Sequence, residues 1–262
     1  TLKWRVLSSN MLAPERRNKI MQILNEQKQI TVKEVAKRLN VSEGTLRNDL
    51  RILEEDGLLE RTHGGAVLPK PLVHEYSFGM RSETNRAEKM AIGKAALQFV
   101  HNGQCIILDA SSTTLEFAKQ LCQFDYLTVV TNGLFTAQEL TRNPRINVIV
   151  TGGVLRPGSG SLEGLLGKGL LSQIHADIFF ASAHGFTLEE GLTDFSVYET
   201  ELKKLFVSSV DKVIALLDHT KLGRRSIATF AERDQIDVLI TDAGADRDFL
   251  RKVESRNIQV VV

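Results

Sequence analysis

The stretch from residue 42 to residue 56 places cationic and hydrogen-bonding side chains on one side of a predicted helix. They lie opposite a stripe of three leucines and comprise Gly44, Thr45, Arg47, Asn48 and Arg51. Guanidinium and amide groups read base edges in the DNA major groove, and Ser42 can cap the helix. A solvated amphipathic helix would show the same pattern in isolation, so the flanking sequence has to decide between the two.

The flanking sequence favours a helix-turn-helix. A capping box at Thr31–Glu34 opens a short helix, and residues 40–42 form a turn too short for anything but two steeply crossing helices. An earlier helix is expected over residues 14–27. Two short strands are expected at residues 58–62 and 66–68, on either side of residues 63–65, and together they predict a two-stranded wing. Its tip would carry Arg61 and His63, two further candidates for DNA contact.

Polar residues in the second half of the chain follow strand-like apolar runs. They stand at Asp109–Thr114, Thr131–Gly133, Thr151–Gly153, His184–Gly185, Asp218–Lys221 and Thr241–Gly244. In an open parallel sheet these strand ends share one edge, where ligands bind. Ser111–Thr114 also opens a helix, so hydroxyls and backbone N–H groups there can converge on an anion. A binding pocket is predicted at this edge, although each loop alone is explained by ordinary turn chemistry.

Three carboxylates in this half are candidate general bases. Proton transfer between carbon atoms needs such a group, and Asp109, Asp194 and Glu199 qualify by type. Hydrogen bonds to hydroxyl groups of a ligand would explain the same carboxylates. His63, His184 and His219 lack metal-ligand spacing, so we predict no metal and no cofactor.

Seven apolar runs provide the strands that position these residues. They are Cys105–Leu108, Leu127–Val130, Ile146–Val150, Ile178–Ala181, Val213–Leu217, Val238–Ile240 and Ile258–Val262. Helix-like segments separate most of them, at Thr114–Leu121, Leu134–Leu140, Leu165–Ser172, Val197–Val207 and Asp246–Glu254. The alternation predicts an α/β main domain with a mostly parallel sheet covered on both faces.

Length, composition and charge divide the chain of 262 residues into two domains. We expect an N-terminal extension at 1–13, a winged helix-turn-helix at 14–68, a linker at 69–86 and the α/β domain at 87–262. Residues 1–70 hold 13 Lys and Arg against 9 Asp and Glu, whereas residues 71–262 hold 20 against 23. A basic first domain suits binding to DNA phosphates. No apolar run has membrane-spanning length, and two isolated cysteines fit buried thiols of a cytoplasmic protein.

Two stretches resemble the DeoR family of bacterial sugar-responsive repressors. Helix, turn, helix and the wing sequence Arg61-Thr62-His63-Gly64-Gly65-Ala66 follow in the family's order, although many members carry Arg where this chain has Asn48. The family's C-terminal loops fall on Asp109–Thr114, Thr131-Asn132, Gly152–Arg156, Gly191–Glu199 and Asp218–Lys221. One departure is Ala110-Ser111, which replaces the usual Ser-Gly. The resemblance implies a second domain similar to ribose-5-phosphate isomerase that binds a phosphorylated sugar or a related metabolite.

The residue patterns and the resemblance together predict residue roles. Operator contacts would come from Ser42, Gly44, Thr45, Arg47, Asn48, Arg51, Arg61 and His63. Effector contacts would come from Asp109, Ser111, Ser112, Thr113, Thr114, Asn132, Gly152, Gly153, Arg156, Asp194 and Lys221. We expect the phosphate against Ser112–Thr114 and Lys221, with Arg156 closing over it from a glycine-rich loop and the hydroxyls facing Asn132, Asp109 and Asp194.

Three functions remain open from the sequence. The first is a transcriptional regulator that binds double-stranded operator DNA as a homo-oligomer and responds to a phosphorylated sugar. The second is an isomerase-like enzyme of sugar phosphates carrying a DNA-binding domain. The third is a constitutive DNA-bending protein whose α/β domain only oligomerises. The predicted pocket argues against the third, and the helix-turn-helix argues against a free-standing enzyme.

Overall fold

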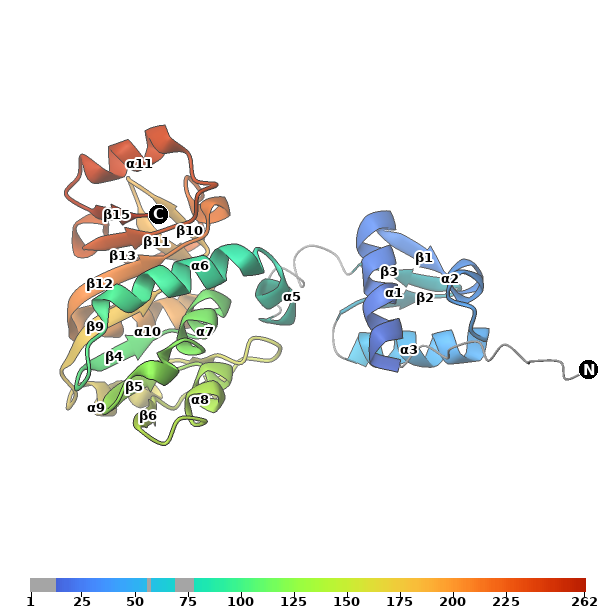
Figure 1. Cartoon of the computed structure of the whole chain (residues 1–262), viewed down its shortest axis with the longest axis horizontal. Helices are drawn as coiled ribbons and strands as arrows, with labels where there is room; N and C mark the ends of the chain where they lie inside the picture. The colour runs from blue at the N-terminus through green and yellow to red at the C-terminus, as the bar shows by residue number, and fades with distance from the viewer. Residues whose placement is uncertain (1–12, 56–57, 69–77) are drawn as a thin grey trace, which may run out of the picture. The chain divides into compact units, whose positions relative to one another are not determined.

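The chain divides into two compact units, one ending at Met80 and the other beginning at Arg81. A computed structural model describes residues 13–55, 58–68 and 78–262 (Figure 1). The expected extension lies almost wholly outside the described residues, as do residue 56 at the end of the predicted helix and the first half of the expected linker. The last part of that linker contains a short helix, α5 (Phe78–Glu83).

The N-terminal unit is a three-helix domain with a small antiparallel sheet. Its helices are α1 (Ala13–Gln27), α2 (Val32–Leu39) and α3 (Glu43–Glu55), and its strands are β1 (Gln29–Thr31), β2 (Glu60–Thr62) and β3 (Gly65–Val67). The strand order is β1-β3-β2. The predicted helix-turn-helix and wing are present, but the sequence did not predict β1. That strand makes the wing part of a three-stranded sheet.

Local hydrogen bonds set the turn between α2 and α3. The Thr31 hydroxyl accepts the backbone N–H of Glu34 at 3.3 Å and so caps α2. Asn40 ends this helix in the left-handed region, with φ at 53°. The Ser42 hydroxyl then accepts the N–H of Thr45 at 3.0 Å and caps α3. Asn40 and the Ser42 cap thus fix the turn between the two helices.

A buried ion pair joins α1 to the inner side of α3. Asp49 is only 2% exposed, and both its oxygens accept from Arg16, at 2.5 Å from Nε and 3.2 Å from Nη2. Isoleucines of α1 and leucines of α3 pack around the pair in one core cluster. A two-pronged Arg–carboxylate contact fixes orientation as well as distance. The pair therefore sets the rotation of α3 about its own axis.

The second unit is built on a seven-stranded parallel sheet with the order β15-β14-β12-β9-β4-β5-β6. Its strands are β4 (Cys105–Leu108), β5 (Leu127–Thr131), β6 (Ile146–Val150), β9 (Ala176–Ala181), β12 (Val210–Leu216), β14 (Val238–Ile240) and β15 (Gln259–Val261). Each neighbouring pair is parallel. All seven predicted strands are in this sheet, so the predicted α/β class is confirmed.

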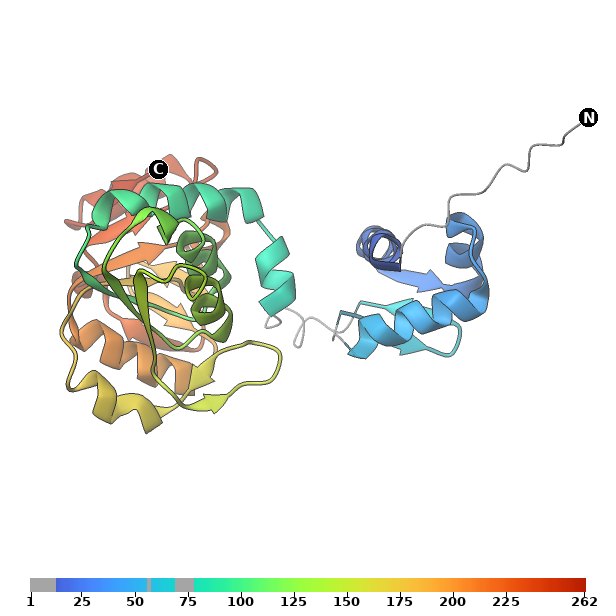
Figure 2. The same cartoon turned by 60° about the horizontal axis from the view of Figure 1, so that its bottom comes forward.

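Helices cover both faces of the sheet (Figures 1 and 2). One core cluster joins the strands to α6 (Arg86–Ala96), α7 (Ser112–Ala118) and α8 (Leu134–Leu140). The other joins them to α9 (Lys168–Leu171), α10 (Val197–Ser208) and α11 (Arg247–Glu254). Successive strand residues alternate between the clusters, as Ile106 and Ile107 do. Apolar residues on both faces produce the continuous runs seen in the sequence.

Two smaller strand groups were not predicted. A three-stranded antiparallel sheet has the order β10-β11-β13, from Gly185–Thr187, Gly191–Asp194 and Ala228–Ala231. A hairpin pairs β7 (Val154–Leu155) with β8 (Leu162–Glu163) within the glycine-rich loop. Among the described residues, no helix is long and apolar enough to cross a membrane.

Candidate functional site

The predicted DNA-contacting residues lie at the surface of the N-terminal unit. Thr45 is half-buried, and the other residues of the set are exposed: Ser42, Gly44, Arg47, Asn48, Arg51, Arg61 and His63. On the opposite side of α3, Leu46, Leu50 and Leu53 are buried. Helix α3 thus has a buried side that packs within the unit and an opposite side that carries the polar residues.

Each arginine of this surface is held by a glutamate. Arg47 pairs with Glu43 at 2.7 Å and Arg51 with Glu55 at 2.5 Å. Arg61 pairs with Glu54 at 3.0 Å, and its backbone N–H donates to the same carboxylate. These glutamate partners were not predicted from the sequence, because the pattern of a DNA-contacting helix concerns only its cationic and hydrogen-bonding residues.

The polar loops of the second unit meet at one edge because their strands are parallel neighbours. Loops after β9, β4, β5 and β6 follow one another along this edge. A Cβ at Gly133 would lie 3.0 Å from the Ala110 Cα, so the loops after β4 and β5 touch through backbone. The polar residues predicted to share an edge therefore do so.

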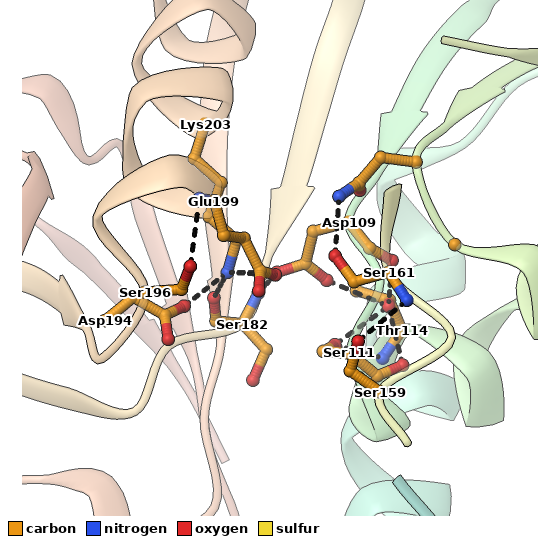
Figure 3. A network of polar contacts seen from close by, with 12 residues as sticks. Asp109, Ser111, Thr114, Ser159, Ser161, Ser182, Asp194, Ser196, Glu199 and Lys203 are labelled. Atoms are coloured by element: carbon orange, nitrogen blue, oxygen red, sulfur yellow. Dashed lines mark hydrogen bonds and ion pairs between the residues drawn. The ribbon is translucent and has the colours of Figure 1, made fainter. Parts of the chain in front are cut away.

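Asp109, at the end of β4, organises the centre of the edge (Figure 3). Its side chain is completely buried. Oδ1 accepts the Thr114 hydroxyl at 2.9 Å, and Oδ2 accepts the Ser182 backbone N–H at 2.9 Å. Ser111 caps α7 by accepting the N–H of Thr114 at 3.1 Å. With its oxygens engaged and out of reach, Asp109 shapes the loop rather than presenting an acceptor to a ligand.

Lys203, from the middle of α10, stands at the centre of the same network and was missed by the sequence reasoning. It is 1% exposed, and its Nζ lies 2.9 Å from Asp109, 2.7 Å from Asp194 and 3.6 Å from Glu199 (Figure 3). The Ser182 carbonyl accepts from it at 2.9 Å. Burial lowers the pKa of Lys203, but the three carboxylates outweigh it and raise the pKa above its usual range.

The surroundings of Glu199 favour the protonated, uncharged form of its carboxyl group. Burial is the largest cause that raises its pKa, to about 7, and the charges of Asp194 and Asp109 act in the same direction. Lys203 opposes them. The cluster places three carboxylates around one ammonium group, and a proton on Glu199 relieves the excess of negative charge.

Folding stability should consequently depend on the protonation of Glu199. Its folded pKa of about 7 lies above the ordinary value of 4.5, so the folded state binds more protons between these pH values. The free energy of unfolding should fall as pH rises through this window, with a slope approaching about 1.4 kcal/mol per pH unit for one proton. We expect Glu199→Gln to remove this contribution in urea titrations. The exposed neighbour substitution Glu201→Gln should preserve it, and equal slopes for both variants would contradict the assignment.

Asn132, at the end of β5, carries an unused acceptor. The side chain is fully buried, and its Nδ2 donates to the Ser161 hydroxyl at 3.3 Å and the Leu162 carbonyl at 3.1 Å. Its Oδ1 has no hydrogen-bond partner among the described residues. Buried polar atoms are nearly always satisfied, so this oxygen calls for a donor that the described residues do not supply.

Cationic side chains gather beside the carboxylates. Arg156, on the β7–β8 hairpin, lies over the Phe195 ring at 4.6 Å and pairs with Glu163 at 3.3 Å. Gly152 and Gly153 lead from β6 into this hairpin. His184 packs edge-on against Phe195 and accepts from Arg224 at 2.8 Å. These contacts bring two guanidinium groups close to the segment that carries Asp194.

Lys221 ends a short 3-10 helix, η4 (His219–Lys221), that joins the edge to α6. Asp218 caps this turn and also accepts from Asn85 Nδ2 at 3.1 Å. Lys89 of α6 donates to the carbonyls of Arg81 and Thr84, at the end of α5. Burial lowers the pKa of Lys89 to about 8, with Lys221 and Arg81 adding to the effect and Asp218 opposing it.

The families matched by the chain correspond to its two units. Residues 16–71 match the DeoR-like helix-turn-helix domain, and residues 84–243 match the DeoR C terminal sensor domain. Solved structures similar to the second unit include ribose 5-phosphate isomerase A from Methanocaldococcus jannaschii, with a TM-score of 0.39 and 17% identity. That similarity covers 53% of this chain and 55% of the isomerase.

Full-length relatives are named as regulators. The HTH-type transcriptional regulator GolR of Listeria innocua is 49% identical, with 95% of this chain and 98% of GolR covered. The HTH-type transcriptional repressor GlcR of Bacillus subtilis is 34% identical, with 96% and 97% covered. Both domains and nearly the whole length thus agree, and the chain belongs to the DeoR family of helix-turn-helix transcriptional regulators, with a DNA-binding domain followed by a sensor domain.

Proposed function

We propose that this regulator represses a carbohydrate-utilisation operon and that a phosphorylated sugar, bound at the polar edge of the sensor domain, alters operator binding. The observation that carries the effector assignment is the buried Asn132 with its unpartnered Oδ1, which can accept a sugar hydroxyl. The exposed face of α3 supports operator binding. The sensor domain supports a small-molecule effector, and the cations beside the carboxylates support a phosphate on it.

Recognition of DNA bases falls in this proposal to Arg47, Asn48 and Arg51. Ser42, Gly44 and Thr45 permit close approach at the start of α3, and Arg61 and His63 contact the phosphate backbone from the wing. The side chains that would meet bases are exposed, whereas Asp49 and the leucines hold the helix from behind. This division follows the geometry of winged helix-turn-helix domains.

Arg47→Ala should weaken binding to the cognate operator far more than binding to random DNA. Loss of a two-pronged guanidinium contact to a base costs about 1–3 kcal/mol, or roughly 5- to 150-fold in affinity. Fluorescence anisotropy with both duplexes at a single salt concentration measures the difference. An equal loss on both duplexes would make Arg47 a phosphate contact instead.

The effector site in this proposal combines hydroxyls, an amide and cations. Ser112 and Thr113 are buried at the start of α7 and hold the phosphate with Lys221, while Ser111 and Thr114 shape the turn. Arg156 closes from its hairpin, and the backbone of Gly152 and Gly153 lines the approach. Asn132 accepts one sugar hydroxyl and Asp194 another. Asp109 does not contact the ligand in this proposal, and instead it positions Thr114 and Lys203.

Coupling to DNA would pass through the contacts around α5 and α6. Asp218, in the Lys221 loop, bonds Asn85 immediately before α6, and Lys89 holds the last carbonyls of α5. A phosphate on Lys221 would change the charge that Lys89 and Asp218 face and so alter how firmly α5 is held. Because coupling is reciprocal, DNA should change effector affinity by the factor by which effector changes DNA affinity.

A thermal-shift screen of phosphorylated sugars against the full chain tests the effector assignment. Lys221→Ala and Thr113→Ala should each lower the affinity for the sugar phosphate identified in the screen by about tenfold or more. This is the usual cost of losing a charge-assisted hydrogen bond. Binding of ligand-free protein to DNA should remain unchanged. Normal binding by both variants, or equal binding of the unphosphorylated sugar, would remove the phosphate from this position.

We also propose that the regulator acts as a homo-oligomer. One helix-turn-helix reads only a few base pairs, so two copies are needed to read two half-sites about one or more helical turns apart. Sedimentation should show an assembly larger than a monomer at micromolar concentration. A monomer both with and without DNA would contradict this.

An isomerase-like activity is the second candidate, and one observation favours it. Burial raises the pKa of Glu199 to about 7, which suits a general base near neutral pH. Against it, Lys203 engages Asp194 and Asp109, and the relatives are named as transcriptional regulators. Incubation of the protein with ribose 5-phosphate, followed by NMR, would reveal turnover if this candidate were correct.

A further inference from the structure

The proposed reading helix carries more negative than positive charge. Helix α3 holds two arginines against four carboxylates. One of the four, Asp49, is buried and neutralised by Arg16 from α1. The other three are exposed and are called here the acidic triplet: Glu43, Glu54 and Glu55. A helix that binds a polyanion gains nothing from such charges through simple attraction, so their presence requires another explanation.

Each member of the acidic triplet holds one cation of the proposed DNA surface. Glu43 holds Arg47 and Glu55 holds Arg51, both within α3, and Glu54 reaches Arg61 in the wing. The match is one to one, so the described part of this surface is close to neutral. Lys33, Lys37 and Arg38 on α2 are exposed and form no ion pair with the described residues, which leaves α2 with the generic attraction for phosphate.

Helix stability does not explain two members of the triplet. Glu54 and Glu55 stand in the last turn of α3, which contains no basic residue. Carboxylates at that end oppose the helix dipole. The Arg51–Glu55 pair also has the less favourable order, with the cation on the N-terminal side. Glu43 is different because it stands in the first turn, where a carboxylate stabilises the helix.

We propose that the acidic triplet determines specificity by penalising contact with DNA phosphates while leaving base recognition intact. The inference rests on the proposed operator-reading role of Arg47 and Arg51. When the arginines turn toward the backbone instead of the base edges, their carboxylate partners come within a Debye length of the phosphates, about 8 Å at physiological salt, and repel them. Only a sequence that offers good base contacts avoids this repulsion.

The paired arginines keep the donors that base recognition needs. Glu43 engages a single guanidinium nitrogen of Arg47, Nη2. In Arg51, Nη1 pairs with Glu55 and Nη2 donates one hydrogen bond to Asn48 Oδ1 at 3.2 Å. A guanidinium has five N–H donors, so others remain for the two acceptors on a guanine edge. A phosphate oxygen would bring a full negative charge beside the glutamate, whereas a base edge brings none. The Arg–Glu pair therefore distinguishes a base from the backbone.

Charge-removing substitutions in the full-length protein test the proposal. Wild-type protein first selects a duplex from a random-sequence pool of 30 base pairs or so. Glu43→Gln and Glu55→Gln are then titrated against this duplex and a scrambled one over a range of salt concentrations. Glu26→Gln is the matched control, because Glu26 is an exposed glutamate on α1 and its substitution changes net charge equally.

We expect each triplet variant to bind the scrambled duplex about 3- to 10-fold more tightly than Glu26→Gln does, with a steeper salt dependence. Binding to the selected duplex should change by less than about twofold, so the specificity ratio falls. An unchanged ratio would overturn the inference. So would a ratio that falls only through weaker binding to the selected duplex, which would make the glutamates direct base contacts. If wild-type protein selects no sequence, the proposed function itself fails and the inference fails with it.

Discussion

Replacement of Lys203 by methionine should lower the free energy of unfolding of the second unit by about 3–5 kcal/mol. The substitution preserves the length of the side chain but removes the ammonium group that faces Asp109, Asp194 and Glu199. Loss of one partner from a buried ion pair leaves charges in a poorly solvated interior, and measured costs fall in this range. Urea unfolding at neutral pH is the appropriate measurement.

Lys204→Met is the matched control for this prediction. Lys204 is the next residue on α10 and is exposed, so its replacement should change stability by no more than about 0.5 kcal/mol. The cost of Lys203→Met should also shrink toward acidic pH, because protonation removes the unpaired charges. Similar losses for the two variants, or a loss independent of pH, would show that water reaches the carboxylates.

Gly65→Ala should disrupt the N-terminal unit and abolish operator binding. A Cβ at Gly65 would lie 1.8 Å from the Ile30 carbonyl oxygen and 2.9 Å from its carbon. Both atoms belong to the backbone of β1, which pairs with β3 at this point, so no side chain can move aside. We expect a loss of at least about 3 kcal/mol, the upper end of overpacking costs.

Gly64 provides the control within the same wing, because a Cβ there meets nothing within 4 Å. Gly64→Ala should therefore fold and protect its amides as the wild type does. Hydrogen exchange of peptides from residues 13–68 in the full-length protein distinguishes the variants. Equal protection in Gly65→Ala and Gly64→Ala would mean that β1 can separate from the wing at little cost.

The seven-stranded sheet could be predicted because each of its strands is a continuous apolar run in the sequence. Seven continuous apolar runs correspond to seven strands whose residues are buried on both faces. Strands β10, β11 and β13 gave no such signal, since they are short and β11 contains both glycine and aspartate. Their pairing brings Thr193 to Thr229, far along the chain, and local periodicity carries no information about such partners.

Most of the candidate site was predictable because its residues follow strands. Lys203 was not predicted because it lies within helix α10, whereas most of the predicted site residues follow the ends of strands. A signal was nevertheless present. Glu199, Leu202, Lys203 and Phe206 have the spacing of one helical face, and that face contains two large apolar residues. Charged residues on an otherwise buried stripe indicate an internal ion pair.

The joint between Arg16 and Asp49 bears on how relatives of this protein can diverge. Because that pair and the leucines fix α3 from its inner side, the outward residues contribute much less to the fold. Substitutions at Thr45, Arg47, Asn48 or Arg51 can accumulate after gene duplication without loss of the scaffold. A daughter protein can thus acquire a new operator while it inherits the old sensor, and regulatory circuits can be rewired one side chain at a time.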